Sequence, residues 1–143
     1  MTLHALVVDD NEVNLHLVRR VLEGHGFTVE TVRDGMTAMA ALDRARPDVI
    51  VLDIMMPGMN GIEVLDRIKA TPRLASIPVI MLTAKSADGD VLDSYRSGAD
   101  YYLTKPLIAR QLVYGLGLVL GREFPETPTD SLAPSPPRPD RSR

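Results

Sequence analysis

Carboxylates follow two short apolar runs in this sequence, each at the point where the run ends. Asp9 and Asp10 come directly after ALVV, and Asp53 comes directly after VIVL. A run without polar residues is typical of a strand that is buried on both faces. A single charge at the end of such a strand is costly, or becomes protonated, unless it has partners. We therefore expect the three acids to share a site with polar groups from elsewhere in the chain.

A hydroxyl and an ammonium group stand at the ends of two further apolar runs. Thr83 ends VIMLT, and Lys105 follows YYLT. With Lys105 and one divalent cation, the acids would form a site whose formal charges sum to zero. Oxygen ligands without His or Cys favour Mg²⁺, for which Mn²⁺ could substitute. An aspartate neutralised in this way, beside a lysine and a hydroxyl donor, is suited to covalent phosphoryl transfer.

Five short β-branched runs predict the strands that carry these residues. The predicted strands are 5–8, 28–31, 49–52, 79–82 and 101–103. Between and after them lie stretches whose apolar residues recur at helical spacing. The apolar stripes are Val13, Leu17, Val18, Val21 and Leu22; Ala38, Ala41, Leu42 and Ala45; Gly61, Val64, Leu65 and Ile68; Val91, Leu92 and Tyr95; and Leu112, Val113, Leu116, Val119 and Leu120. Asn60, with Glu63 three residues later, predicts an N-cap with a capping box.

Five units of strand followed by helix imply a parallel sheet with helices on both faces. Right-handed crossovers leave few topologies, and we predict a flavodoxin-like, doubly wound (βα)5 three-layer sandwich with strand order 2-1-3-4-5, an order that is common in this fold class. All carboxyl ends of parallel strands meet at one edge of the sheet. This edge would bring Asp9, Asp10, Asp53, Thr83 and Lys105 together.

The composition sets bounds on the protein. The 143 residues are 45% apolar, which suits one folded domain, and the absence of Cys excludes disulfides and thiol chemistry. The net charge of −3 gives no basic field for nucleic acid, so we expect no direct DNA binding. Neither a signal peptide nor an apolar run of membrane-spanning length is visible, so we expect a soluble cytoplasmic protein with no membrane contact. Residues 122–143 are rich in Pro, Ser and Arg, which predicts a flexible tail after a domain at 1–121.

Four sequence blocks resemble those of bacterial response-regulator receiver domains, in the same order and at similar intervals. The blocks are LVVDDNEVN, VIVLDIMMPGMNG, IPVIMLTAKS and GADYYLTKPL. The resemblance covers residues 4 to about 121. It implies a single-domain response regulator of two-component phosphorelay signalling, with a receiver domain at 1–121.

The resemblance also implies a role for each site residue. Asp53 matches the phosphoacceptor aspartate. Asp10 and Asp53 match direct Mg²⁺ ligands, the backbone carbonyl of Met55 would complete the protein's share of ligands, and Asp9 would bind the ion through water.

Further roles carried over from the family concern switching. Thr83 matches the switch hydroxyl, and Lys105 matches the lysine that contacts the phosphoryl group. Tyr102 matches the aromatic residue whose rotamer reports phosphorylation. The peptide bond between Lys105 and Pro106 would be cis.

The resemblance implies a signalling switch whose only reactions are its own phosphorylation and dephosphorylation. A sensor histidine kinase or a phosphotransfer protein would supply the phosphoryl group to Asp53. The surface of the fourth helix, the fifth strand and the fifth helix would then regulate a downstream protein. Tyr114 and Leu118 lie off the inward stripe of the last helix, so we also predict a homodimer through this surface. Met55 and Lys85 would obstruct the water that attacks the acyl phosphate.

Three alternatives remain open at this point. In the first, the chain is a receiver fragment of a larger regulator or hybrid kinase whose effector domain is absent, and the Pro-rich segment is its linker. Alternatively, it is a phosphatase of the haloacid dehalogenase type, although Met55 stands where those enzymes place a second aspartate. A flavodoxin-like cofactor binder is disfavoured, because DDNEVN is acidic and would repel a phosphate.

Overall fold

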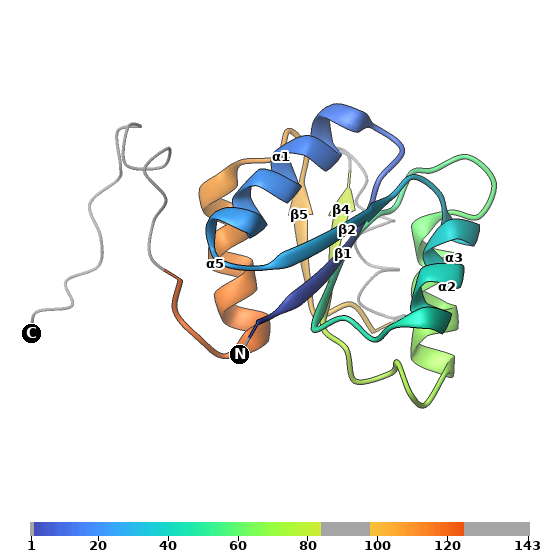
Figure 1. The fold of residues 1–143 in the computed structure, drawn as a ribbon. Helices are drawn as coiled ribbons and strands as arrows, with labels where there is room; N and C mark the ends of the chain where they lie inside the picture. The colour runs from blue at the N-terminus through green and yellow to red at the C-terminus, as the bar shows by residue number, and fades with distance from the viewer. Residues whose placement is uncertain (1, 84–97, 125–143) are drawn as a thin grey trace, which may run out of the picture.

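A five-stranded parallel sheet forms the centre of the protein in the computed structural model, which describes residues 2–83 and 98–124. The strand order is β2-β1-β3-β4-β5, and every neighbouring pair is parallel (Figure 1). The strands are β1 (His4–Val8), β2 (Thr28–Val32), β3 (Val49–Asp53), β4 (Val79–Thr83) and β5 (Tyr101–Thr104). The predicted fold class and strand order are therefore confirmed.

Helices cover both faces of the sheet. They are α1 (Glu12–Gly24), α2 (Gly35–Arg44), α3 (Gly61–Ala70) and α5 (Ala109–Leu120). Figure 1 shows α1 and α5 on one side of the sheet and α2 and α3 on the other. The helix predicted around Val91, Leu92 and Tyr95, the residue Lys85 and the chain from 125 onward lie outside the described residues.

Two apolar cores fill the space between the layers. Side chains on β3 alternate between them: Ile50 and Leu52 belong to the core under α2 and α3, whereas Val49 and Val51 belong to the core under α1 and α5. Every residue of β3 and β4 is buried. This burial on both faces explains why these strands read as continuous apolar runs rather than as alternating ones.

Side-chain caps fix the points at which three helices begin. Asn11 accepts a hydrogen bond from the Asn14 amide at the start of α1, and Asp34 accepts one from the Thr37 amide at the start of α2. The predicted capping box at α3 is present: Asn60 and Glu63 each accept a hydrogen bond from the other's backbone amide. All three caps end loops that follow β1, β2 and β3 at the carboxyl edge of the sheet, so they anchor the loops of that edge.

Two predicted core positions are wrong. Val13 is 75% exposed, and Leu15 is buried in its place, because α1 begins at Glu12 and turns Leu15, Val18 and Leu22 toward the sheet. Ala45 is exposed because α2 ends at Arg44, and Ala45 itself is the extended C-cap. The expected exposure of Tyr114 and Leu118 on α5 is confirmed, at 63% and 54%.

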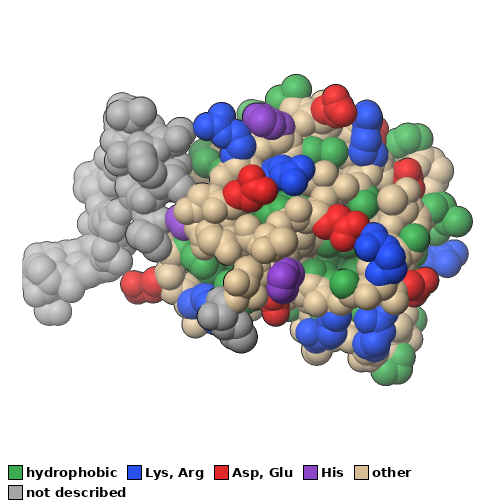
Figure 2. Space-filling model, viewed as in Figure 1, with side chains coloured by type: hydrophobic (Ala, Val, Ile, Leu, Met, Phe, Trp, Pro, Cys, Tyr) green, Lys and Arg blue, Asp and Glu red, His purple; other side chains and the backbone are tan. Residues whose placement is uncertain are grey.

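Charged side chains of both signs are interspersed over the face shown in Figure 2. Exposed ion pairs of the described residues include Arg44–Glu30 at 2.7 Å and Arg19–Glu23 at 3.1 Å. Such exposed pairs each contribute little to stability. No helix in the described part of the chain has the length and apolar character needed to cross a bilayer.

Candidate active site at the carboxyl edge of the sheet

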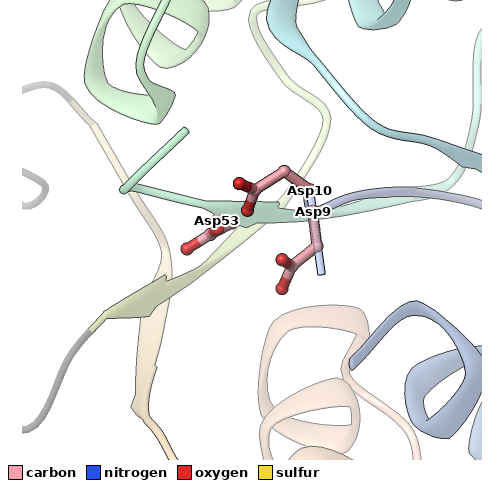
Figure 3. A group of neighbouring side chains, drawn as sticks. All are labelled: Asp9, Asp10 and Asp53. Carbon is pink, nitrogen blue, oxygen red and sulfur yellow. The ribbon is translucent and has the colours of Figure 1, made fainter. Parts of the chain in front are cut away.

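Three carboxyl groups meet where β1 and β3 end. Asp9 and Asp10 follow β1, and Asp53 is the last residue of β3; Figure 3 shows the three side chains around a common space. One oxygen from each acid lies within 4.8 Å of the corresponding oxygens of the other two. Asp9 and Asp53 are buried, and Asp10 is half-buried. The topology therefore brings the three predicted acids together, as the sequence indicates.

Lys105 reaches this acid cluster from the loop after β5. Its Nζ atom lies 3.1 Å from Asp53 Oδ1 and 3.5 Å from Asp9 Oδ2. The peptide bond between Lys105 and Pro106 is cis. Lys105 thus pairs with the two most deeply buried acids of the site.

Thr83 lies on β4, the strand beside Asp53, and Tyr102 lies on β5, the next strand of the sheet. Thr83 is the last residue of β4 and is fully buried, and its carbonyl oxygen accepts a hydrogen bond from the Lys105 amide at 2.8 Å. Tyr102 is paired with Met81 across β4 and β5, is half-buried and packs against the core under α2 and α3. The position of Thr83 at the strand end is as predicted, and the switch roles of both residues stay predictions.

The loops that carry the acids are held by their own carboxylates. Asp9 Oδ1 accepts a hydrogen bond from the Asn11 amide at 2.9 Å, and Asp53 Oδ1 accepts one from the Met55 amide at 3.3 Å. Gly61, the first residue of α3, packs against the main chain of Asp53, and its amide donates to the Ile54 carbonyl at 2.9 Å. The carboxylates of Asp9 and Asp53 therefore line the site and also hold the loops that follow them.

Arg33 is a site residue that the sequence interpretation missed. It follows β2, and its guanidinium donates to the Asp10 carbonyl oxygen at 3.2 Å and to a Glu12 carboxylate oxygen at 3.3 Å. Its position one residue after a strand on the same sheet edge was a signal that placed it near the acids. The sequence could not predict this hydrogen bond, because the atom of Asp10 that accepts it is the main-chain carbonyl oxygen.

The electrostatics of the site centre on Asp53. Burial, reinforced by the nearby charge of Asp9, raises the pKa of Asp53 to about 7, although the hydrogen bond and the charge of Lys105 act in the opposite direction. Among the described residues, the Oδ2 atoms of Asp9 and Asp53 accept no hydrogen bond. Positive charge added beside these two oxygens would favour the ionised form of Asp53.

The acid cluster fits a divalent cation. The atoms that could bind a metal are carboxylate oxygens, which suit hard ions such as Mg²⁺, and the cluster contains neither His nor Cys. Two of its buried oxygens accept no hydrogen bond from the described residues, which is costly. Lys105 Nζ lies 3.5 Å from one of them, Asp9 Oδ2, but a single lysine does not balance three acids. The residues present therefore fit a metal site.

Residues 5–116 match the sequence pattern of the response regulator receiver domain. The match spans most of the chain and includes Asp9, Asp10, Asp53, Thr83 and Lys105. This chain belongs to the response regulator receiver domain family. Members of this family are signalling switches rather than conventional enzymes, and they work with histidine kinases and downstream targets. The similarity predicted from the sequence blocks is thus confirmed.

Similar proteins include regulators that are much longer than this chain. The response regulator PleD of Caulobacter vibrioides is 43% identical over 107 residues, covering 75% of this chain and 24% of PleD. The DNA-binding response regulator MtrA of Mycolicibacterium paratuberculosis is 42% identical over 108 residues, covering 76% of this chain and 47% of MtrA. The match thus spans about a quarter of PleD and about half of MtrA.

A solved structure is similar over its whole length. The crystal structure of a putative response regulator from Chloroflexus aurantiacus superimposes with a TM-score of 0.82 at 29% sequence identity. The superposition covers 85% of this chain and 100% of that chain. The similarity supports the flavodoxin-like fold of the receiver.

Proposed function

We propose that this receiver accepts a phosphoryl group on Asp53 from a histidine kinase or a phosphotransfer protein, with Mg²⁺ as cofactor. The observation that carries the proposal is the 3.1 Å contact between Lys105 Nζ and Asp53 Oδ1 inside a buried acid cluster. A structural ion pair would not need two further acids. A phosphoryl acceptor needs this combination, because negative charge enters the site with the phosphoryl group.

The chemical step is a transfer between phosphohistidine and carboxylate. A carboxylate oxygen of Asp53 attacks phosphorus, the new P–O bond forms as the P–N bond breaks, and the imidazole nitrogen keeps the electron pair. Lys105 offsets charge on the transferred oxygens, and the Thr83 hydroxyl donates a hydrogen bond to one of them. The same receiver later hydrolyses the acyl phosphate.

Mg²⁺ would be held by the acid cluster. Asp10, Asp53 and the Met55 carbonyl are the direct ligands in this proposal, and Asp9 acts through a water molecule; Mn²⁺ would serve in its place. When bound, the ion supplies positive charge that offsets the charge of the phosphoryl oxygens. Its positive charge would also offset the charge of Asp9, which raises the pKa of Asp53, and would so favour the ionised Asp53 that acts as the nucleophile.

The output follows from changes on the neighbouring strands. Thr83 would move toward the phosphoryl group, and Tyr102 would turn into the space that it leaves. This change would act on a surface made of β5, α5 and the helix predicted outside the described residues, and it shifts the balance of states only if partners bind the two states differently. A downstream protein would read this surface, without direct DNA contact by the receiver itself.

Self-association is part of the same proposal. Tyr114 and Leu118 present exposed apolar surface on α5. A second receiver would cover this surface after phosphorylation. Burial of two such side chains supports association only if it outweighs the loss of translational and rotational freedom.

Two organisations of the whole protein fit the comparisons. A regulator made of a receiver domain alone fits the full coverage of the Chloroflexus aurantiacus chain. A receiver within a larger regulator fits the 24% and 47% coverage of PleD and MtrA. The reading frame of the gene distinguishes the two.

Intact-mass spectrometry tests the proposed activity. The protein is incubated with acetyl phosphate and Mg²⁺, and the mass of one phosphoryl group should be added. The Asp53→Asn variant and the wild type in EDTA should gain none. A mass gain that is equal in Asp53→Asn would refute the proposal.

A further inference from the structure

Arg33 links the loop after β2 to the loop after β1. Its guanidinium donates to the carbonyl oxygen of Asp10 at 3.2 Å and to Oε1 of Glu12, in the first turn of α1, at 3.3 Å. One side chain therefore spans the segment in which Asp10 lies. It does so at the solvent-facing rim of the acid cluster, since the Arg33 side chain is 59% exposed.

Two further hydrogen bonds hold the main chain of this segment. The Asp9 amide donates to the Val32 carbonyl at 3.2 Å, and the Asn11 amide donates to Asp9 Oδ1 at 2.9 Å. These contacts hold the peptide before Asp9 and the peptide that joins Asp10 to Asn11. Arg33 contacts the carbonyl oxygen of Asp10, which belongs to the peptide that joins Asp10 to Asn11. It therefore restrains the rotation of that peptide.

We infer that Arg33 is a positioning residue for the metal site, and that it acts by holding the Asp10 main chain so that the carboxylate faces Asp53. This inference rests on the proposed Mg²⁺-dependent function, which it deepens. A ligand held in place before the ion arrives loses less conformational freedom on binding, and so binds more tightly. Glu12 supports the arrangement, because its carboxylate holds the other nitrogen of the guanidinium.

The sign of one measurement separates positioning from simple charge. A cation near a divalent metal site opposes metal binding, so removal of Arg33 would tighten binding of Mg²⁺ if charge alone mattered. Removal of a positioning contact has the opposite effect and weakens it. Because an exposed contact of this kind is worth about 0.2–1 kcal/mol, we expect Arg33→Met to weaken Mg²⁺ binding by a factor of about 1.4 to 5.

Isothermal titration of the full chain with Mg²⁺ measures this change. Arg44→Met is the matched control: it removes the same charge from an exposed pair with Glu30 that joins β2 to α2, and its pair does not contact Asp10. It should leave the Kd for Mg²⁺ unchanged. Arg33→Lys, which keeps the charge but not the forked geometry, should recover no more than part of the lost affinity.

The phosphorylation rate gives a second readout. In Arg33→Met, the Mg²⁺ concentration for half-maximal phosphorylation by acetyl phosphate should rise by the same factor, whereas the rate at saturating Mg²⁺ should stay at the wild-type value. A general loss of structure would lower the saturating rate instead. An unchanged or lower Kd in Arg33→Met would overturn the inference.

Failure of the proposed function would be recognised separately. If the wild type binds no Mg²⁺, the function fails, and the effect of Arg33 on Asp10 is then judged in metal-free protein by hydrogen exchange at the Asn11 amide. Faster exchange in Arg33→Met than in Arg44→Met would support the conclusion that Arg33 positions this loop. Equal exchange would reject it.

Discussion

Gly61 lies against the main chain of Asp53 so closely that any Cβ atom at position 61 would collide with the Asp53 carbonyl oxygen. The same Cβ would also lie 2.8 Å from the Cα atom of Ile54, a distance that side chains essentially never adopt. The first turn of α3 thus packs directly on the peptide that holds the proposed phosphoacceptor. The absence of a side chain at Gly61 is what allows the helix to approach it.

Gly61→Ala should therefore disturb both stability and the site. Both clashing groups are backbone, so the helix or the strand end must move, and we expect a loss of about 1–3 kcal/mol in unfolding free energy. Gly58→Ala is the control in the same loop: a Cβ there meets nothing within 4 Å, so only its positive φ of 75° carries a cost. Urea unfolding measures both variants. A smaller loss for Gly61→Ala than for Gly58→Ala would contradict the packing argument.

The stability of the metal-free protein should fall as pH rises. Burial and the charge of Asp9 raise the pKa of Asp53 to about 7, whereas about 3.9 is expected in the unfolded chain. Between these values the folded protein retains a proton that the unfolded chain has released. The stability due to this group is thus complete below pH ~4 and is lost as pH approaches ~7.

Chemical unfolding in EDTA, followed by circular dichroism from pH ~5 to ~8, measures this dependence. Asp53→Asn cannot ionise at this position, so its unfolding free energy should decline less steeply than that of the wild type. The difference between the two curves isolates Asp53 from the other titrating groups. Parallel curves would show that the pKa of Asp53 is not raised.

The lifetime of the phosphorylated form should depend on Met55. This side chain is 61% exposed in the loop after Asp53, and we predict that it obstructs the attacking water. Met55→Asn should speed dephosphorylation roughly three- to tenfold, equivalent to about 1 kcal/mol of barrier. Met36→Asn, a change at another exposed methionine in the first turn of α2, is the control. Phosphate release after removal of the donor gives the rates, and no acceleration in Met55→Asn would count against the obstruction.

Self-association should require the apolar surface of α5. Sedimentation velocity with beryllofluoride as a phosphoryl mimic should show dimers of the wild type and monomers of Tyr114→Arg. The charged side chain at the centre of the contact would have to be desolvated, which opposes association. A wild type that stays monomeric with and without the mimic at high concentration would rule out the dimer.

The alternation of the sequence was enough to predict a parallel sheet covered by helices and to group most of the site residues, whereas the strand order was taken as the common one of this fold class. Once the strands are parallel and joined by helices, the residues that follow β1, β3 and β5 must meet at one edge. Asp9, Asp53 and Lys105 could therefore be grouped without coordinates. The caps at Asn60 and Glu63 were also predictable, because their hydrogen bonds are local in sequence.

Contacts with main-chain atoms were not predictable in the same way. The acceptor of Arg33 is a carbonyl group, which every residue carries, so no residue type marks it. The close approach of Gly61 to Asp53 likewise depends on the angle at which α3 leaves the sheet. The error at Val13 has another cause: the buried face of α1 runs through Leu15, Val18 and Leu22, and the apolar stripe was too broad to show that Val13 lies outside it.

Chemical mapping of the phosphorylated residue tests the proposed role of Asp53 most directly. After incubation with acetyl phosphate and Mg²⁺, borohydride reduces an aspartyl phosphate to homoserine, and peptide mass spectrometry locates the change. We predict homoserine at position 53 and an unmodified Asp9 and Asp10. Homoserine at position 9 or 10, or at no aspartate, would contradict the assignment of Asp53 as the phosphoacceptor.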